Sequence, residues 1–381
     1  MMSIPTMMND VTDFTSKLVG FASINPPGDE LEILQYLNGL LTEVGFETEL
    51  VFFGERRGNL IARYGPQDDP ICLSGHVDVV PLGLKDWSQS PFEPKVVDGK
   101  LYGRGTTDMK GGVAAMLIAA SRLIANGEAL KRGILVVITG GEETGCDGVQ
   151  ALMDRSDLKA GMLLIPEPSS NIPLVGHKGA FWIRLMASGK TAHGSMPEQG
   201  DNAAYKLVDA VSRLKAAQVP GGVHKVFGPT TMNLGRMNAG LNINSVPDQA
   251  WADLDFRTTP NTPHEELLHW VKSHVEDLDI SIEIIVDLNP VYTNPDDHQV
   301  TRLLQRLHLE GVDHDPGTVM FFTDGALLKP LLGNCPFVVL GPGEPHLAHQ
   351  TDEYCFVERL EQAVELYEQL LLDYCQDRQI S

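Results

Sequence analysis

Histidine and carboxylate residues recur at the points where apolar stretches of this sequence end. The apolar stretches span residues 71–74, 134–139, 162–165 and 337–340, and the polar residues that follow them are His76, Asp78, Glu142, Glu143, Glu167 and His349. A further acid, Asp108, lies in a glycine-rich segment. Imidazole and carboxylate groups without a thiolate suit Zn²⁺, Co²⁺ or Mn²⁺. These residue types therefore predict a metal site if the fold brings them together.

Electrostatics favours metal ions at such a cluster. Several carboxylates within a few ångströms of one another cannot all stay ionised without a counter-charge, which divalent cations supply. Such ions lower the pKa of a bound water and polarise a carbonyl, which is the chemistry of amide hydrolysis. His76 and Asp78 would lie on one side of an extended segment, so we expect the Asp78 carboxylate to hold the His76 imidazole N–H.

The apolar stretches also predict the elements that position these side chains. Each stretch is short and continuous, as expected of a strand that is buried on both faces of a parallel sheet. Between the first two stretches, Val113, Met116, Leu117, Ala120 and Ile124 repeat with helical spacing. Alternating strands and helices predict an α/β fold with a doubly wound, mainly parallel sheet. The carboxyl ends of its strands should meet at the edge where ligands bind.

The middle of the chain has a different pattern. Strand patterns occur near 181–187, 230–236, 250–256 and 280–286, and helical patterns near 202–217 and 264–277. Their order (strand, helix, two strands, helix, strand) predicts an inserted α+β domain of the ferredoxin-like kind. Thr262 and Pro263 are the expected N-cap and first residue of its second helix. We therefore expect a catalytic domain in two parts, residues 1–179 and 290–381, with the inserted domain at residues 180–289.

Composition narrows the range of partners. The chain has 381 residues, and 29 Lys and Arg against 51 Asp and Glu give a formal net charge of −22. This charge disfavours binding to nucleic acid and to anionic membranes. Five scattered cysteines favour reduced thiols, and the first residues lack the pattern of a secretory signal. With no apolar run of membrane-spanning length, a cytoplasmic location is expected.

The motifs resemble those of a known family. The stretches SGHVDVVP, YGRGTTDMKGG, GGEETG, IPEPS and LGPGEPHLAHQTDEY are similar to those of the M20 metallopeptidases, in the acetylornithine deacetylase and succinyl-diaminopimelate desuccinylase branch. The resemblance covers nearly the whole chain. It implies that His76, Asp108 and Glu167 bind one metal ion, and that Asp108, Glu143 and His349 bind a second.

The resemblance implies further roles. Glu142 would be the general base, and the Asp108–Met109 peptide bond would be cis. The inserted domain resembles the lid and dimerisation domain of the family, so a homodimer is implied. His193 matches the histidine that stabilises the oxyanion across that dimer. Substrate binding is implied for four residues, of which the first two match positions that bind a carboxylate: Asn244, Arg257, Lys178 and Thr323.

The function expected from this pattern is hydrolysis of the amide bond of a small N-acyl amino acid, with two divalent metal ions, zinc foremost. Within the same class, an exopeptidase or dipeptidase is the alternative. His177-Lys178-Gly179 resembles the acetylornithine deacetylases and YGRGTTDMKGG the desuccinylases, so the acyl group stays open. A relative that binds metal without catalysis would not need Glu142.

Two site residues have competing interpretations. His346 lies three residues before His349 and could be the metal ligand in its place. Arg257 could pair only with Asp255 or Asp253 instead of binding substrate.

Overall fold

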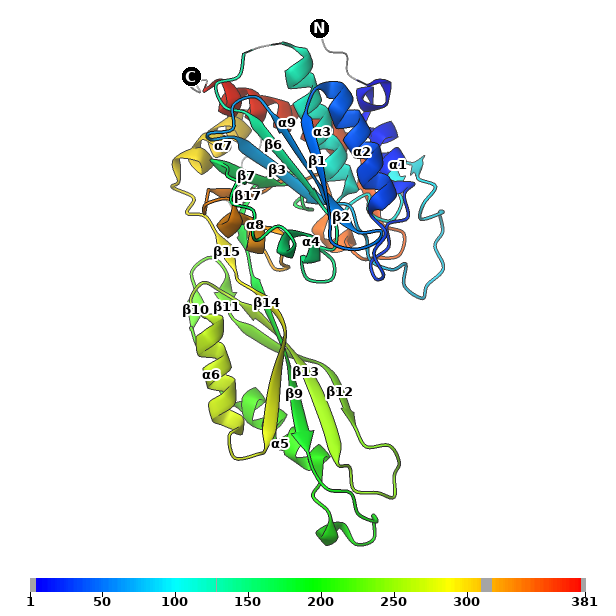
Figure 1. The fold of residues 1–381 in the computed structure, drawn as a ribbon, viewed down its shortest axis with the longest axis vertical. Helices are drawn as coiled ribbons and strands as arrows, with labels where there is room; N and C mark the ends of the chain where they lie inside the picture. The colour runs from blue at the N-terminus through cyan, green and yellow to red at the C-terminus, as the bar shows by residue number, and fades with distance from the viewer. Residues whose placement is uncertain (1–4, 128, 310–316, 378–381) are drawn as a thin grey trace. The chain divides into compact units, whose positions relative to one another are not determined.

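The computed structural model describes residues 5–127, 129–309 and 317–377. The chain divides into two compact units (Figure 1). The first consists of Met1–Gly176, Tyr292–Gly317 and Thr323–Ser381, and the second of His177–Val291 and Thr318–Phe322. The second unit thus interrupts the first in sequence.

A mixed sheet forms the centre of the first unit, with strands in the order β1-β2-β6-β3-β7-β17-β8-β15 (Figure 1). Its central strands β6, β3, β7 and β17 are parallel, whereas β1 and β2 are antiparallel additions at one side. The strands are β1 Glu47–Phe52, β2 Gly58–Tyr64, β3 Ile71–His76, β6 Ile134–Thr139, β7 Met162–Ile165, β8 Leu174–His177, β15 Val291–Tyr292 and β17 Phe337–Val339, and β16 Gly317–Val319 pairs with β8. All residues of β3, β6 and β7 are buried, as the continuous apolar stretches predicted.

The connections between these strands wind in both directions. Helix α3 (Lys110–Ala125) leads from β3 to β6 on one side, and α4 (Asp147–Gln150) leads from β6 to β7 on the other side of β3. Right-handed connections of opposite direction place their helices on opposite faces of the sheet. The predicted doubly wound α/β fold is therefore confirmed.

The remaining elements of the first unit complete its layers. Helices α1 and α9 pack against α3, whose residues are nearly all buried. A small separate sheet has the order β18-β5-β4. The bounds are α1 Val11–Val19, α2 Leu31–Val44, α7 His298–Leu309, α8 Gly325–Leu331, α9 Val357–Gln376, β4 Lys95–Val97, β5 Lys100–Tyr102 and β18 Tyr354–Phe356.

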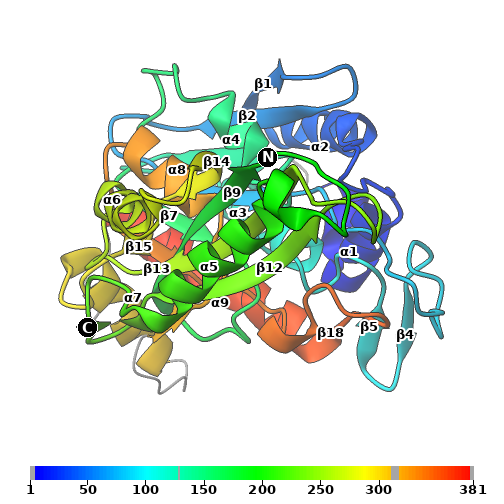
Figure 2. The same ribbon diagram turned by 90° about the horizontal axis from the view of Figure 1, so that it is seen from below.

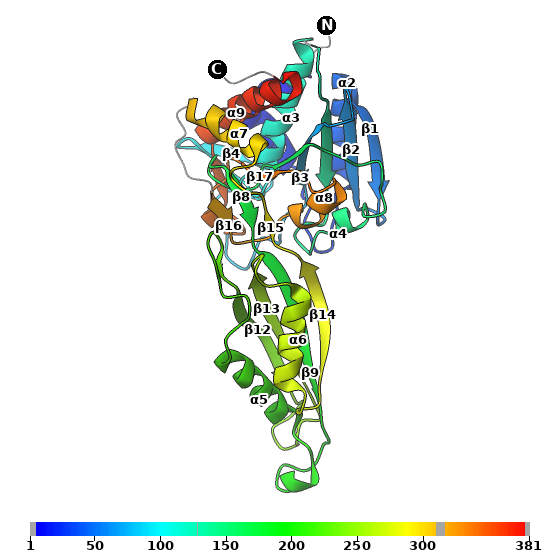
Figure 3. The same ribbon diagram turned by 90° about the vertical axis from the view of Figure 1, so that its left-hand side faces the viewer.

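The second unit is an antiparallel sheet with two helices. Its strands have the order β12-β13-β9-β14, and each neighbouring pair is antiparallel. Both helices share one core with alternate residues of β9 and β13, so they cover the same face (Figure 3). The bounds are β9 Gly179–Ser188, α5 Ala203–Ala216, β10 Val223–His224, β11 Gly228–Pro229, β12 Thr231–Ala239, β13 Gln249–Thr258, α6 His264–Val275 and β14 Ile280–Leu288. This is the predicted ferredoxin-like order.

One local prediction in this unit is wrong. Pro263 has φ −55° and ψ 138°, so it is the N-cap residue and α6 begins at His264. The hydroxyl of Thr262 does not cap the helix but donates to the carbonyl oxygen of Pro220 at 3.2 Å. Extended ψ at a proline keeps it outside the helix although its φ is compatible with one.

Across the described ranges, no helix combines the length and the apolar character that crossing a membrane requires.

Candidate metal centre

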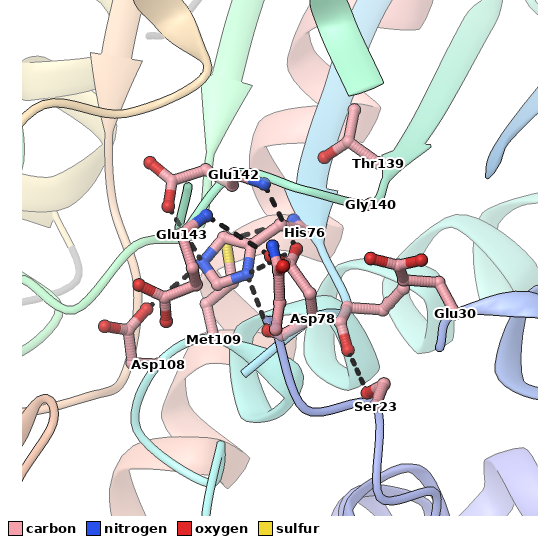
Figure 4. A network of polar contacts seen from close by, with 12 residues as sticks. Ser23, Glu30, His76, Asp78, Asp108, Met109, Thr139, Gly140, Glu142 and Glu143 are labelled. Atoms are coloured by element: carbon pink, nitrogen blue, oxygen red, sulfur yellow. Dashed lines mark hydrogen bonds and ion pairs between the residues drawn. The ribbon is translucent and has the colours of Figure 1, made fainter. Parts of the chain in front are cut away.

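The predicted cluster lies at the carboxyl ends of the parallel strands of the first unit. His76 is the last residue of β3, Glu142 and Glu143 follow β6, and Glu167 follows β7. Asp108 comes just before α3. The connections after β3 and β6 run in opposite directions, and open α/β sheets generally bind ligands at the edge where this happens. Figure 4 shows five of the site side chains converging there: His76, Asp78, Asp108, Glu142 and Glu143.

One half of the cluster surrounds the buried imidazole of His76. Its Nε2 lies 3.2 Å from Asp108 Oδ1 and 3.6 Å from Glu167 Oε1. The same atom is 4.0 Å from Glu142 Oε2. His76, Asp108 and Glu167, the first predicted ligand set, thus lie together around a single nitrogen atom.

The other half surrounds His349. Its Nε2 lies 3.0 Å from Glu143 Oε2 and 3.4 Å from Asp108 Oδ2. Asp108 contacts both histidines, one through each carboxylate oxygen, as a bridging ligand would. The competing His346 lies elsewhere, with 73% of its side chain exposed and its Nδ1 3.7 Å from Glu344. The contacts therefore favour His349 over His346.

Asp78 occupies a different place from the one predicted. Nδ1 of His76 is 3.0 Å from the backbone carbonyl oxygen of Asp78, whereas the nearest carboxylate oxygen is 3.6 Å away. The Asp78 carboxylate accepts hydrogen bonds from the backbone N–H groups of Glu142 and Glu143, each at 3.2 Å, and from the Asn25 amide at 2.8 Å. The buried Asp78 carboxylate thus hydrogen-bonds the backbone of the Glu142–Glu143 loop, and its ion pair with the imidazole is the longer contact, 3.6 Å.

Burial and like charge raise the pKa of several acids in the cluster. Burial raises the pKa of Glu142 well above its usual value, and the carboxylates of Glu167 and Glu143 add to the effect. Burial, with the charge of Asp108, does the same to the pKa of Glu167. Hydrogen bonds to Asp108 and Glu143 raise the pKa of His349 to about 10. A buried site with this much crowded negative charge favours cations.

The donor set fits divalent metal ions. His76, Glu142 and Glu167 form one group whose ligand atoms lie within 4.8 Å of one another, and His76, Asp108 and Glu143 form a second. Oε1 of Glu143 is buried and has no hydrogen-bond partner among the described residues, so a lone pair remains for an ion. The first of these groups contains Glu142, the expected general base, in addition to expected ligands.

Several buried residues beside the cluster were not predicted. Asp324 accepts a hydrogen bond from Thr139 Oγ1 at 2.5 Å, and burial raises its pKa to about 6. Its second oxygen has no partner in the described part of the chain. Glu353 and Arg104 form a buried ion pair close to Asp108. In the sequence Asp324 is a polar residue before a helix and Glu353 is part of a polar run, and neither pattern distinguishes a buried side chain from a solvated one.

The residues implied in substrate binding lie mostly in the second unit. Asn244 and His193 are both exposed. Their segments are neighbours, since the Gly194 N–H donates to Asn244 O at 2.7 Å. Arg257 Nε lies 2.9 Å from Asp255, the partner foreseen in the competing interpretation, and its guanidinium group is 5.7 Å from the Trp182 ring centre.

Two residues implied in substrate binding are buried. Lys178, in the second unit, donates from Nζ to Pro229 O at 2.7 Å. Thr323 of the first unit accepts from the Gly325 N–H at 3.0 Å.

Comparison with known sequences gives consistent matches. A sequence profile described as Peptidase family M20/M25/M40 matches residues 72–373. A probable succinyl-diaminopimelate desuccinylase from Staphylococcus epidermidis is 33% identical over 91% of this chain and 93% of its own. A succinyl-diaminopimelate desuccinylase from Wolbachia pipientis is 30% identical over 97% of this chain and 94% of its own.

Solved structures share the fold. An M20 family metallo-carboxypeptidase from Sulfolobus solfataricus superposes with a TM-score of 0.80 at 18% identity, over 95% of this chain and 98% of its own. The aminopeptidase PepT from Bacillus cereus superposes with a TM-score of 0.77 at 23% identity, over 95% of this chain and 97% of its own. At these identities the likeness concerns the fold and not the substrate.

Proposed function

Because the chain belongs to peptidase family M20/M25/M40, we propose that it hydrolyses the amide bond of a small N-acyl amino acid with the help of two divalent metal ions, zinc foremost. One observation carries the proposal. His76 Nε2 lies within 4.0 Å of Asp108, Glu167 and Glu142, and His349 Nε2 lies within 3.4 Å of Asp108 and Glu143, which supports two sets of ligands with Asp108 in common. The resemblance implied the same two sets.

Each residue has a proposed task. His76, Asp108 and Glu167 hold one ion, and Asp108, Glu143 and His349 hold the other. Bound metal ions supply a water of lowered pKa and polarise the scissile carbonyl. Glu142 takes a proton from the attacking water and returns it to the leaving amine.

The raised pKa of Glu142 suits its task as general base. Burial raises the pKa of Glu142 well above its usual value, so its carboxylate is a stronger proton acceptor than an exposed one. Asp78 keeps the loop of Glu142 in place through the two backbone hydrogen bonds.

The relatives favour an acyl group with a second carboxylate. Both are named for the removal of a succinyl group from diaminopimelate. We expect kcat/KM for N-succinyl amino acids to exceed that for dipeptides of the same amino acid by on the order of 10² or more, since a site built to bind one group rejects analogues that lack it.

The measurement is a comparison of initial rates with the zinc-loaded protein on matched N-succinyl, N-acetyl and N-formyl amino acids and on dipeptides. Faster cleavage of dipeptides would favour the exopeptidase alternative. The metal-loaded protein cleaving none of these amides would contradict hydrolysis and favour the non-catalytic alternative.

We also propose that the second unit forms a homodimer. Strand β12 is an edge of its sheet and most of its residues are exposed, and α5 lies beside it (Figure 2). Four large apolar side chains are exposed on these two elements, Tyr205, Val208, Leu234 and Met237. An uncovered edge with apolar neighbours favours pairing with a second copy about a twofold axis. The oxyanion role implied for His193 depends on such a dimer.

Charge on this edge should therefore separate the copies. Val208→Glu combined with Leu234→Glu should halve the mass measured by sedimentation equilibrium and lower turnover. Ile284→Glu with Ile285→Glu is the matched control, because these side chains are 45% and 42% exposed on β14 at the opposite edge. The control should remain dimeric. A monomeric wild-type protein, or a dimeric edge variant, would contradict the interface.

A further inference from the structure

Arg104 and Glu353 form a buried ion pair that joins the two loops carrying Asp108 and His349. Arg104 Nη1 lies 2.6 Å from Glu353 Oε2, and the two side chains are 1% and 0% exposed. Arg104 lies four residues before Asp108 in the sequence, and Glu353 lies four residues after His349. Buried charges need hydrogen-bonding partners, and both terminal nitrogens of Arg104 have them, whereas its Nε has none in the described part of the chain.

The Glu353 carboxylate binds the backbone of the Asp108 loop. Its Oε1 accepts from the N–H groups of Thr107 at 2.9 Å and Asp108 at 3.0 Å, and its Oε2 accepts from the N–H of Gly105 at 3.0 Å. Together with Arg104, these donors use both oxygens. Glu353 therefore acts on Asp108 through the backbone and is not itself placed to ligate a metal ion.

Arg104 binds the loop that carries His349. Its Nη1 donates to the carbonyl oxygen of Gln350, the residue after His349, at 3.2 Å. Its Nη2 donates to Pro81 O at 3.2 Å, and its guanidinium group lies 5.0 Å from the Trp87 ring centre. The planar fork of arginine can bond to several groups at fixed angles, which an ammonium group cannot reproduce.

Strand pairing extends the connection between the two loops. Glu353 immediately precedes β18, which pairs antiparallel with β5. The Gly103 N–H donates to Glu353 O at 2.9 Å, and the Thr107 hydroxyl donates to Tyr354 O at 2.7 Å. His349, by contrast, has 53% of its side chain exposed, so its own packing restrains it little. Its position depends on neighbours of this kind.

We propose that Arg104 and Glu353 are positioning residues that fix Asp108 and His349 relative to each other and thereby set the affinity of the chain for the divalent metal ion that these ligands share with Glu143. The inference rests on the proposed function for the identity of the ligands. Ligands held in place before binding lose less freedom when the ion binds. Loss of a residue that orients ligands typically lowers metal affinity by about 10–100-fold.

Two variants test the pair. Glu353→Gln keeps the shape of the side chain, but its amide NH₂ replaces an oxygen that accepts backbone N–H groups and leaves Arg104 without its anionic partner. Arg104→Lys keeps the positive charge but replaces the planar guanidinium group, with its several N–H donors, by an ammonium group. Zinc is titrated into each metal-free protein in a calorimeter, and the thermal midpoint of each metal-free protein is measured alongside. The visible spectrum of the Co²⁺-loaded protein reports whether the ligand geometry changes.

We expect Glu353→Gln to weaken zinc binding by about 10–100-fold and to alter the Co²⁺ spectrum, and Arg104→Lys to change both in the same direction to a smaller extent. The matched control is Asp373→Asn, which breaks another carboxylate–guanidinium pair of the first unit, with 2.6 Å between Arg306 and Asp373. This control should lower the thermal midpoint and leave zinc affinity unchanged.

Zinc affinity in Glu353→Gln equal to that of the wild type would overturn the inference and leave a purely structural pair. Should that variant not fold, Arg104→Lys decides by the same comparison. Because no substrate is needed, a wild-type protein that binds zinc and cleaves no amide would contradict the proposed function while the positioning role still holds.

Discussion

Glu142→Gln should lower turnover by on the order of 10²–10⁴-fold while the protein still binds its metal ions. Glutamine has the shape of glutamate but cannot take a proton from water. The hydrogen bond that anchors residue 142 to Asp78 comes from its backbone N–H, so the loop should keep its position. The measurements are kcat at saturating substrate and the metal content by elemental analysis.

Glu143→Gln is the matched comparison, because the two acids are adjacent in sequence and differ in contacts. Glu143 lies 3.0 Å from His349, so its replacement should lower metal content as well as activity. Full activity in Glu142→Gln would remove the general-base assignment. Loss of metal from that variant would instead make Glu142 a ligand, as its grouping with His76 and Glu167 allows.

Complete removal of metal by a chelator should abolish hydrolysis, and added Zn²⁺ or Co²⁺ should restore it. The carboxylates of Glu142, Glu143 and Glu167 lie close together, and without cations they repel one another. No metal ion then remains to lower the pKa of a water molecule and polarise the carbonyl. Activity is measured against metal content as the ions are withdrawn and returned. The two quantities should fall and rise together.

The same chelator saturated with Zn²⁺ beforehand is the control, and it should leave activity intact. A chelator that already holds Zn²⁺ has no capacity to take the ion from the protein, so any loss of activity it caused would come from the chelator itself. Hydrolysis that continues after elemental analysis finds no metal would contradict the proposed mechanism.

The central strands were predictable because burial on both faces leaves a simple pattern in sequence. Residues 71–74, 134–139 and 162–165 are continuous and apolar, and each lies in a parallel strand of the sheet. The antiparallel strands β1 and β2 were not predicted. Residues of β1 are only partly buried at the edge, so Glu47-Thr48-Glu49 carries little apolar signal. Helix α2 was also missed, although Ile33, Leu34, Leu37 and Leu41 have helical spacing.

The gathering of the candidate ligands was predictable from their positions after strands, since the carboxyl ends of parallel strands share one edge. Their roles as ligands remain predictions. The surroundings of these ligands were not predictable. Asp78 was expected to hold an imidazole and instead holds two backbone N–H groups, because the sequence does not show which donors a buried loop brings near. Glu353 lies in a polar run and Asp324 is an acid just before a helix, and only the fold reveals that both are buried.

The inserted unit separates the candidate ligands into an early and a late group. His76, Asp108, Glu143 and Glu167 precede it, whereas His349 follows it. A ribosome adds about 5–20 residues per second, so the early acids are synthesised many seconds before the histidine that closes their cluster. A nascent chain that stops short of residue 349 lacks one member of the second set. The candidate metal centre can therefore be completed only after the whole inserted unit has been translated.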